Sequence, residues 1–130
     1  MSVPSKGDAR LAVVVEDDDS VREMLCELLR SIGFEVASCR DGSEGLRAAR
    51  ELRPSVLTLD LHMPDMDGFE VLSRLRDDEA TAGLPVVLVS AYVSDRQVRE
   101  CRQVKAVVSK PFDVDELCEK VCSAAGVGQR

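Results

Sequence analysis

One short apolar run that ends in a carboxylate constrains the fold of this chain most. Residues 56–59 (Val-Leu-Thr-Leu) form strands readily and are followed directly by Asp60. Within a few residues the chain must then turn, at Pro64, Asp67 and Gly68. A short apolar run bounded by turn residues is typical of a strand buried on both faces of a parallel sheet. Asp60 therefore stands where a buried strand opens into a loop, and in open parallel sheets ligands bind at this edge.

The same pattern recurs along the chain, because strand-like runs alternate with amphipathic helical patterns. The strand-like runs are residues 11–15, 34–38, 56–59, 86–90 and 106–108. Residues 34–38 alternate in polarity, which is typical of a half-exposed strand at the edge of a sheet. Five strand–helix alternations with short connections predict an α/β sandwich with a parallel sheet. Its crossovers should be right-handed, so that helices cover both faces.

Capping residues and helical periodicity place the helices. We expect helices to begin at four residues that have Glu or Gln three positions later, a capping-box pattern: Ser20, Asp41, Ser94 and Asp113. In the first helix the apolar residues recur at spacings of 3 and 4: Val21, Met24, Leu25, Leu28, Leu29 and Ile32. This predicts that Met24 faces the core and that Arg22 lies on the solvent side, with Gly33 ending the helix.

Size and composition limit the class of protein. The chain has 130 residues, 45% of them apolar, which is enough for one domain with a single aliphatic core. We expect that domain at residues 11–125, between a flexible tail (1–10) and a C-terminal tail or linker (126–130). The net charge of −7 argues against nucleic acid or an anionic membrane as a direct partner.

Cellular location follows from what the sequence lacks. No apolar run reaches the ~20 residues of a membrane span, and the first ten residues do not have the pattern of a signal peptide. The five cysteines are an odd number without a C-x-x-C pair, which favours reduced thiols over a disulfide framework. These features predict a cytoplasmic protein.

Polar residues stand at the ends of four of the five strand-like runs. Glu16 and Asp17 follow the first run and Asp60 the third, Ser90 is the last residue of the fourth, and Lys110 comes shortly after the fifth. Taken singly, each has an ordinary explanation, since acidic residues before a helix favour its dipole. In a parallel sheet, however, all these positions lie on one edge, and together they predict a functional site.

The chemistry of that edge favours a metal ion and phosphoryl transfer. Three carboxylates placed together repel one another unless cations neutralise them, and Lys110 offers one positive charge. The remaining negative charge and the all-oxygen ligands favour Mg²⁺, which keeps several waters and readily takes up phosphate oxygens. An aspartate beside Mg²⁺ can act as a nucleophile towards phosphorus and form an aspartyl phosphate. Charge on the transferring group would be stabilised by the Lys110 ammonium and the Ser90 hydroxyl.

With these motifs in order, the sequence resembles a response-regulator receiver domain of two-component signalling, over about residues 10–125. The resemblance rests on four segments: Val-Val-Val-Glu16-Asp17-Asp18, Leu59-Asp60-Leu61-His62-Met63-Pro64-Asp65-Met66-Asp67-Gly68, Val89-Ser90-Ala91-Tyr92 and Ser109-Lys110-Pro111-Phe112. It implies a flavodoxin-like (βα)5 fold with strand order 2-1-3-4-5. It also implies a phosphorylation-controlled switch that receives its phosphoryl group from a histidine kinase or phosphotransfer protein. The signal would pass by a conformational change to a downstream protein or a fused output domain.

The resemblance also implies a role for each site residue. Asp60 is the phosphoacceptor, which would catalyse its own phosphorylation and dephosphorylation with Ser90 and Lys110. The Mg²⁺ ligands would be Glu16, Asp17, Asp60 and the backbone carbonyl of His62. The family further implies a cis peptide bond between Lys110 and Pro111.

Two positions depart from the family pattern, and two other functions are considered beside the switch. Val107 occupies the place of the aromatic residue that usually swings inward behind the switch hydroxyl, and the segment between Ser90 and Lys110 is about two residues short. One alternative is therefore a degenerate receiver that acts as a phosphorylation-independent interaction module. An aspartyl-phosphate phosphatase is disfavoured, because His62 stands where such enzymes need a second aspartate. His62 and Tyr92 either tune the phosphate lifetime or are plain loop residues.

Overall fold

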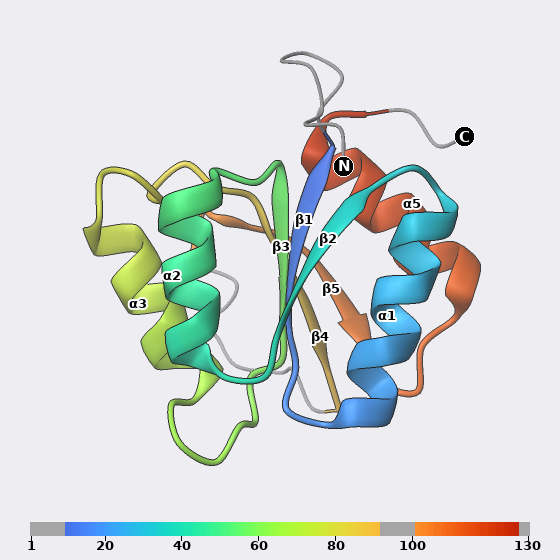
Figure 1. Ribbon diagram of the computed structural model, residues 1–130, viewed down its shortest axis with the longest axis horizontal. Coiled ribbons are helices and arrows are strands. Elements are labelled where there is room, and N and C mark those ends of the chain that lie inside the picture. Colours follow the sequence, from blue (N-terminus) through green and yellow to red (C-terminus); the bar gives the residue numbers. More distant parts are fainter. Residues whose placement is uncertain (1–9, 92–100, 128–130) are drawn as a thin grey trace.

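Five parallel strands form a single sheet in the order β2-β1-β3-β4-β5, as predicted (Figure 1). The structure is a computed structural model that describes residues 10–91 and 101–127. The strands are β1 (Leu11–Val15), β2 (Glu35–Cys39), β3 (Val56–Leu59), β4 (Val86–Ser90) and β5 (Val104–Ser109). The fifth strand is longer than the predicted 106–108, and its pairing with β4 is irregular between Val86 and Val87.

The described helices cover both faces of the sheet. They are α1 (Asp19–Ser31), α2 (Gly42–Leu52), α3 (Gly68–Asp77) and α5 (Val114–Ala125). Figure 1 shows α1 and α5 on one face and α2 and α3 on the other. The helix predicted to begin at Ser94 lies outside the described residues. None of the helices within residues 10–91 and 101–127 has the length and apolar character needed to cross a membrane.

The core is divided by the sheet into two apolar layers. Alternate residues of β1 point to opposite faces, so that Ala12 and Val14 pack with α1 and α5 while Val13 and Val15 pack in the layer of α2 and α3. All residues of β3 and β4 are buried, because both faces of these central strands are covered. Strand β2 is partly exposed at the edge, as its alternating sequence predicted.

The first helix begins at a different cap from the one predicted. Its N-cap is Asp18, whose Oδ1 accepts a hydrogen bond from the Val21 N–H at 3.0 Å, whereas Ser20 already lies inside the helix. Asp18 has extended backbone, the conformation that an N-cap requires, so it ends the loop and opens the helix. The predicted caps Asp41 and Asp113 are confirmed, since each accepts from the N–H of the residue three positions later.

The predicted faces of α1 were also partly wrong. Arg22 is only 8% exposed, whereas Met24 is 44% exposed. The buried stripe of α1 consists of Arg22, Leu25, Cys26 and Leu29. Hydrophobic periodicity cannot predict this, because Arg22 is held inward by hydrogen bonds to a carbonyl and a carboxylate rather than by burial of apolar surface. Leu52 and Val114 are also exposed, at the last position of α2 and the first position of α5.

A close approach of α2 to β1 gives a test of this packing. A Cβ added to Gly45 would lie 2.5 Å from Cγ2 of Val15, a buried and β-branched side chain that has little freedom to move. Overpacking usually costs about 1–3 kcal/mol, and the higher helix propensity of alanine returns about 1 kcal/mol. We therefore expect Gly45→Ala to lower the free energy of unfolding by up to about 2 kcal/mol.

The measurement is urea denaturation of Gly45→Ala beside the matched variant Gly83→Ala. An added Cβ at Gly83 meets nothing within 4 Å, so this control should unfold at nearly the wild-type urea concentration. Equal stability of the two variants would show that α2 does not approach β1 this closely.

Candidate functional site

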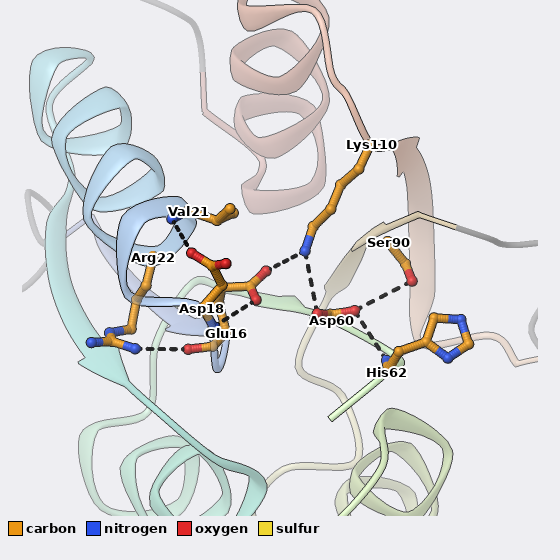
Figure 2. A network of polar contacts seen from close by, with 8 residues as sticks. All are labelled: Glu16, Asp18, Val21, Arg22, Asp60, His62, Ser90 and Lys110. Atoms are coloured by element: carbon orange, nitrogen blue, oxygen red, sulfur yellow. Dashed lines mark hydrogen bonds and ion pairs between the residues drawn. The ribbon is translucent and has the colours of Figure 1, made fainter. Parts of the chain in front are cut away.

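The polar residues that follow the strands meet at one edge of the sheet. Glu16 comes directly after β1, Asp60 directly after β3 and Lys110 directly after β5, while Ser90 is the last residue of β4. Because all five strands are parallel, their carboxyl ends lie together, at the lower edge of the sheet in Figure 1. Figure 2 shows the four side chains joined in one network.

Asp60 lies at the centre of this network. It is 6% exposed, and its two carboxylate oxygens have different partners. Oδ1 accepts hydrogen bonds from the Ser90 hydroxyl at 3.3 Å and from the backbone N–H of His62 at 3.0 Å. Oδ2 accepts from Nζ of Lys110 at 3.2 Å. The network therefore fixes the carboxylate between a cation, a hydroxyl and a backbone donor.

Glu16 shares the same lysine. Its Oε1 lies 2.5 Å from Nζ of Lys110, and its Oε2 accepts from the backbone N–H of Asp18 at 3.1 Å. The residue is 1% exposed. Lys110 thus bridges the carboxylates that follow β1 and β3, which are distant in the sequence and adjacent in the sheet.

Burial and charge change the proton affinity of both partners. Burial raises the pKa of Glu16 to about 7, although the hydrogen bonds from Lys110 and from the Asp18 N–H oppose this rise. Burial lowers the pKa of Lys110, but the hydrogen bond and the negative charge of Glu16, together with Asp60, outweigh it and leave that pKa raised. The lysine therefore stays protonated, while Glu16 is near its midpoint of protonation at neutral pH.

Three carboxylates at this edge are arranged as a metal ion would need them. Ligand oxygens of Glu16, Asp17 and Asp60 all lie within 4.8 Å of one another. Glu16 and Asp60 are buried, while Asp17 is exposed. An all-carboxylate set with one side open to solvent fits Mg²⁺, which prefers oxygen ligands and keeps several waters. These residues therefore form a candidate Mg²⁺ site, and the part predicted for the His62 carbonyl stays a prediction.

The loop after Asp60 requires a glycine at position 68, and the sequence did not show why. A Cβ on Gly68 would lie 2.6 Å from Cα of Leu61 and 2.8 Å from the carbonyl oxygen of Asp60. The Gly68 N–H donates to the Leu61 carbonyl at 2.9 Å, which closes the loop. The sequence indicated only a turn here, whereas the structure shows that the start of α3 packs directly against the backbone that carries Asp60.

The sequence interpretation also missed Arg22. Its Nη1 donates to the backbone carbonyl of Glu16 at 3.0 Å (Figure 2). Its Nη2 donates to Oδ1 of Asp19 at 2.5 Å. A signal was present, because a cation in the first turn of a helix opposes the helix dipole. Acceptors close by in the sequence offset this, and here they are the Glu16 carbonyl of the acidic loop and the Asp19 carboxylate at the start of α1.

The ends of β4 and β5 are joined at the site. The Lys110 N–H donates to the Ser90 carbonyl at 2.9 Å, so that the backbone aligns the hydroxyl and the ammonium. The peptide bond between Lys110 and Pro111 is cis, as the resemblance implied. Val107, also on β5, is half-buried and packs against the apolar layer of α2 and α3.

Comparison with known proteins identifies this arrangement. The model of the response regulator receiver domain family matches residues 12–122. The chain belongs to that family. Among solved structures, the chemotaxis protein CheY4 of Vibrio cholerae superposes with a TM-score of 0.81 at 26% identity, covering 89% of this chain and 98% of CheY4. The flavodoxin-like fold and the place of the chain in two-component signalling are therefore established.

The curated relatives differ in length. The DNA-binding response regulator MtrA of Mycolicibacterium smegmatis is 41% identical over 84% of this chain and 47% of MtrA. The polar-differentiation response regulator DivK of Brucella anthropi is 32% identical over 88% of this chain and 94% of DivK. This receiver chain thus spans about half the length of some relatives and nearly all of others.

The raised pKa of Glu16 predicts a pH-dependent stability in the absence of divalent ions. The folded protein holds this proton up to about pH 7, whereas the ordinary glutamate value is 4.5. Protonated Glu16 stabilises the folded state fully below the ordinary glutamate pKa, and this stabilisation is lost as the pH rises through 7. We expect Glu16→Gln to gain stability relative to the wild type between pH 5 and 8, by up to about 3 kcal/mol at 1.4 kcal/mol per pKa unit.

Urea denaturation at pH 5 and pH 8 with a chelator present measures this difference. Glu23→Gln makes the same chemical change on the exposed face of α1 and controls for removal of a negative charge. A difference between Glu16→Gln and the wild type that is the same at both pH values would contradict the raised pKa.

Proposed function

We propose that this receiver is a phosphorylation-controlled switch in which Asp60 accepts a phosphoryl group. The donor is a phosphohistidine of a histidine kinase or phosphotransfer protein, or a small acyl phosphate. The observation that carries this proposal is the buried Asp60 carboxylate, held between Lys110 and Ser90 beside two further acidic residues. Membership of the receiver family supports it.

The reaction is a transfer from the donor to one carboxylate oxygen of Asp60. An oxygen–phosphorus bond forms, the bond from phosphorus to the donor breaks, and its electron pair leaves with the donor. The Lys110 ammonium and the Ser90 hydroxyl already lie within hydrogen-bond reach of the carboxylate, so both can donate to the oxygens of the transferring group. Water later attacks the phosphorus atom, the bond from phosphorus to the Asp60 oxygen breaks, and inorganic phosphate leaves, which restores the Asp60 carboxylate.

A divalent cation completes this proposal. Glu16, Asp17, Asp60 and the backbone carbonyl of His62 would hold Mg²⁺, which supplies positive charge opposite the phosphoryl oxygens when bound. The residues of the chain do the rest. Lys110 keeps two carboxylates close together without a metal, and the open side at Asp17 admits the donor.

The signal is proposed to pass through protein contacts in the cytoplasm. The net charge of −7 disfavours nucleic acid as a direct partner, so a downstream protein or a fused output domain receives the change. The match covers nearly all of DivK and about half of MtrA, so relatives consist either of a receiver alone or of a receiver within a longer chain. The five cysteines are all free, which fits a reducing compartment.

A second function, an interaction module that works without phosphorylation, is favoured by one observation. Val107 stands on β5 where receivers usually have an aromatic switch residue, and it packs into the apolar layer of α2 and α3. A phosphoryl group on Asp60 that no second conformation recognises would carry no signal. Phosphorylation of Asp60 and its effect on conformation are therefore separate measurements.

Intact mass after incubation with acetyl phosphate tests the phosphoacceptor. We expect one labile phosphoryl group on the wild type in the presence of Mg²⁺, and none on Asp60→Asn or with a chelator. Asp65→Asn changes an exposed aspartate of the same loop and should still be labelled. Equal labelling of Asp60→Asn and the wild type would refute the role of Asp60, and no labelling of any protein would favour the interaction module.

Calorimetric titration with Mg²⁺ tests the acidic cluster. We expect Asp17→Asn to weaken Mg²⁺ binding by roughly tenfold or more, because a neutral amide replaces one of three charged ligands. Asp65→Asn lies outside the cluster and should bind Mg²⁺ as the wild type does. Unchanged affinity of Asp17→Asn would show that the exposed carboxylate does not hold the ion.

A further inference from the structure

A buried arginine lies behind the acidic loop without touching the ligand oxygens of its cluster. The Arg22 side chain is only 10% exposed, although it belongs to the first turn of α1. Its guanidinium donates to the Glu16 carbonyl from Nη1 and to the Asp19 carboxylate from Nη2. A guanidinium that is buried in this way needs hydrogen-bonding partners, and here one belongs to the loop from β1 to α1 and the other to the first residue of α1.

The Glu16 carbonyl is an informative place to hold the chain. It belongs to the peptide that joins Glu16 to Asp17, the two neighbouring acidic residues of the cluster. Because a peptide is planar, a hydrogen bond to that oxygen also fixes the direction in which the chain enters Asp17. The backbone N–H of Arg22 donates to the Asp18 carbonyl at 2.8 Å, so one residue holds the loop at two points.

The shape of the arginine side chain suits this position. Its planar fork reaches two acceptors at once, here a carbonyl and a carboxylate three residues apart in the sequence, which a lysine cannot reproduce. Lys110 contacts the carboxylates of Glu16 and Asp60 directly, whereas Arg22 binds the Glu16 carbonyl and leaves the carboxylate oxygens of the cluster available.

We propose that Arg22 is a positioning residue of the Mg²⁺ and phosphoryl site. It fixes the peptide between Glu16 and Asp17 so that both carboxylates face Asp60 before the ion arrives. This inference rests on the proposed function, because it requires that the acidic cluster binds Mg²⁺. The Arg22 side chain itself touches neither the ion nor the phosphoryl group.

The test compares Mg²⁺ affinity with stability in two variants of Arg22. Arg22→Gln removes the charge and the fork, while Arg22→Lys keeps the charge alone. Arg30→Gln makes the same charge change at an exposed residue in the last turn of α1 and is the control. The dissociation constant for Mg²⁺ is measured by calorimetry on the full chain, and the folded fraction is measured by urea denaturation with a chelator present.

We expect Arg22→Gln to bind Mg²⁺ about tenfold more weakly, the lower end of the effect of losing a group that orients metal ligands. Arg22→Lys should recover part of this affinity, and Arg30→Gln should bind as the wild type does. If Arg22→Gln lost stability but its folded fraction bound Mg²⁺ with unchanged affinity, Arg22 would have only a structural role, and the proposal would be overturned. Full recovery by Arg22→Lys would also overturn it, because charge alone would then suffice.

A milder variant covers the case in which Arg22→Gln does not fold. Asp19→Ala removes the exposed acceptor of the fork and leaves Arg22 in place, since the Asp19 side chain is 77% exposed. We expect weaker Mg²⁺ binding than in Glu23→Ala, which removes the same charge elsewhere on α1. Equal affinities of these two variants would contradict the proposal. Failure of the wild type to bind Mg²⁺ is a different result, which overturns the proposed function together with this inference.

Discussion

The ion pairs of Lys110 with Glu16 and Asp60 hold this protein's site together. Two carboxylates that are 1% and 6% exposed would be costly to bury without a cation between them. The lysine supplies that cation from β5, across the width of β3 and β4. This pairing raises the pKa of Lys110. It also opposes the rise that burial causes in the pKa of Glu16. A preformed site of this kind needs little rearrangement when a cation and a phosphoryl group enter.

The backbone does as much as the side chains to shape this edge. The Asp60 carboxylate is bound by the His62 N–H, and the Glu16 carboxylate by the Asp18 N–H, so each loop caps the acid that begins it. Gly68 lets α3 approach the backbone at Asp60 closely. The two loops are therefore positioned by the start of the helix that follows each strand, and a change in packing of α1 or α3 would reach the acids directly.

Phosphorylation of Asp60 would first affect the ends of β4 and β5, where Ser90 and Lys110 contact its carboxylate. The Ser90 hydroxyl is completely buried and bonded to Asp60, and the Ser90 carbonyl accepts from the Lys110 N–H. A group added to Asp60 competes for the hydroxyl and the ammonium at once, which links the ends of both strands to the chemistry. Val107, on β5, has a smaller apolar side chain than an aromatic residue, so a rearrangement of β5 at Val107 moves little apolar surface.

The sequence by itself determined the sheet, its parallel direction and the residues at its edge. Apolar runs too short for helices, each followed by a capped helical pattern, allow few other folds, and polar residues at the ends of parallel strands must meet. The sequence did not determine the inward position of Arg22, the exposure of Met24 or the cap at Asp18. These depend on which carbonyls and carboxylates come within reach after the strands pair. Periodicity records the average burial of apolar residues, whereas only the tertiary structure places a single donor against a single acceptor.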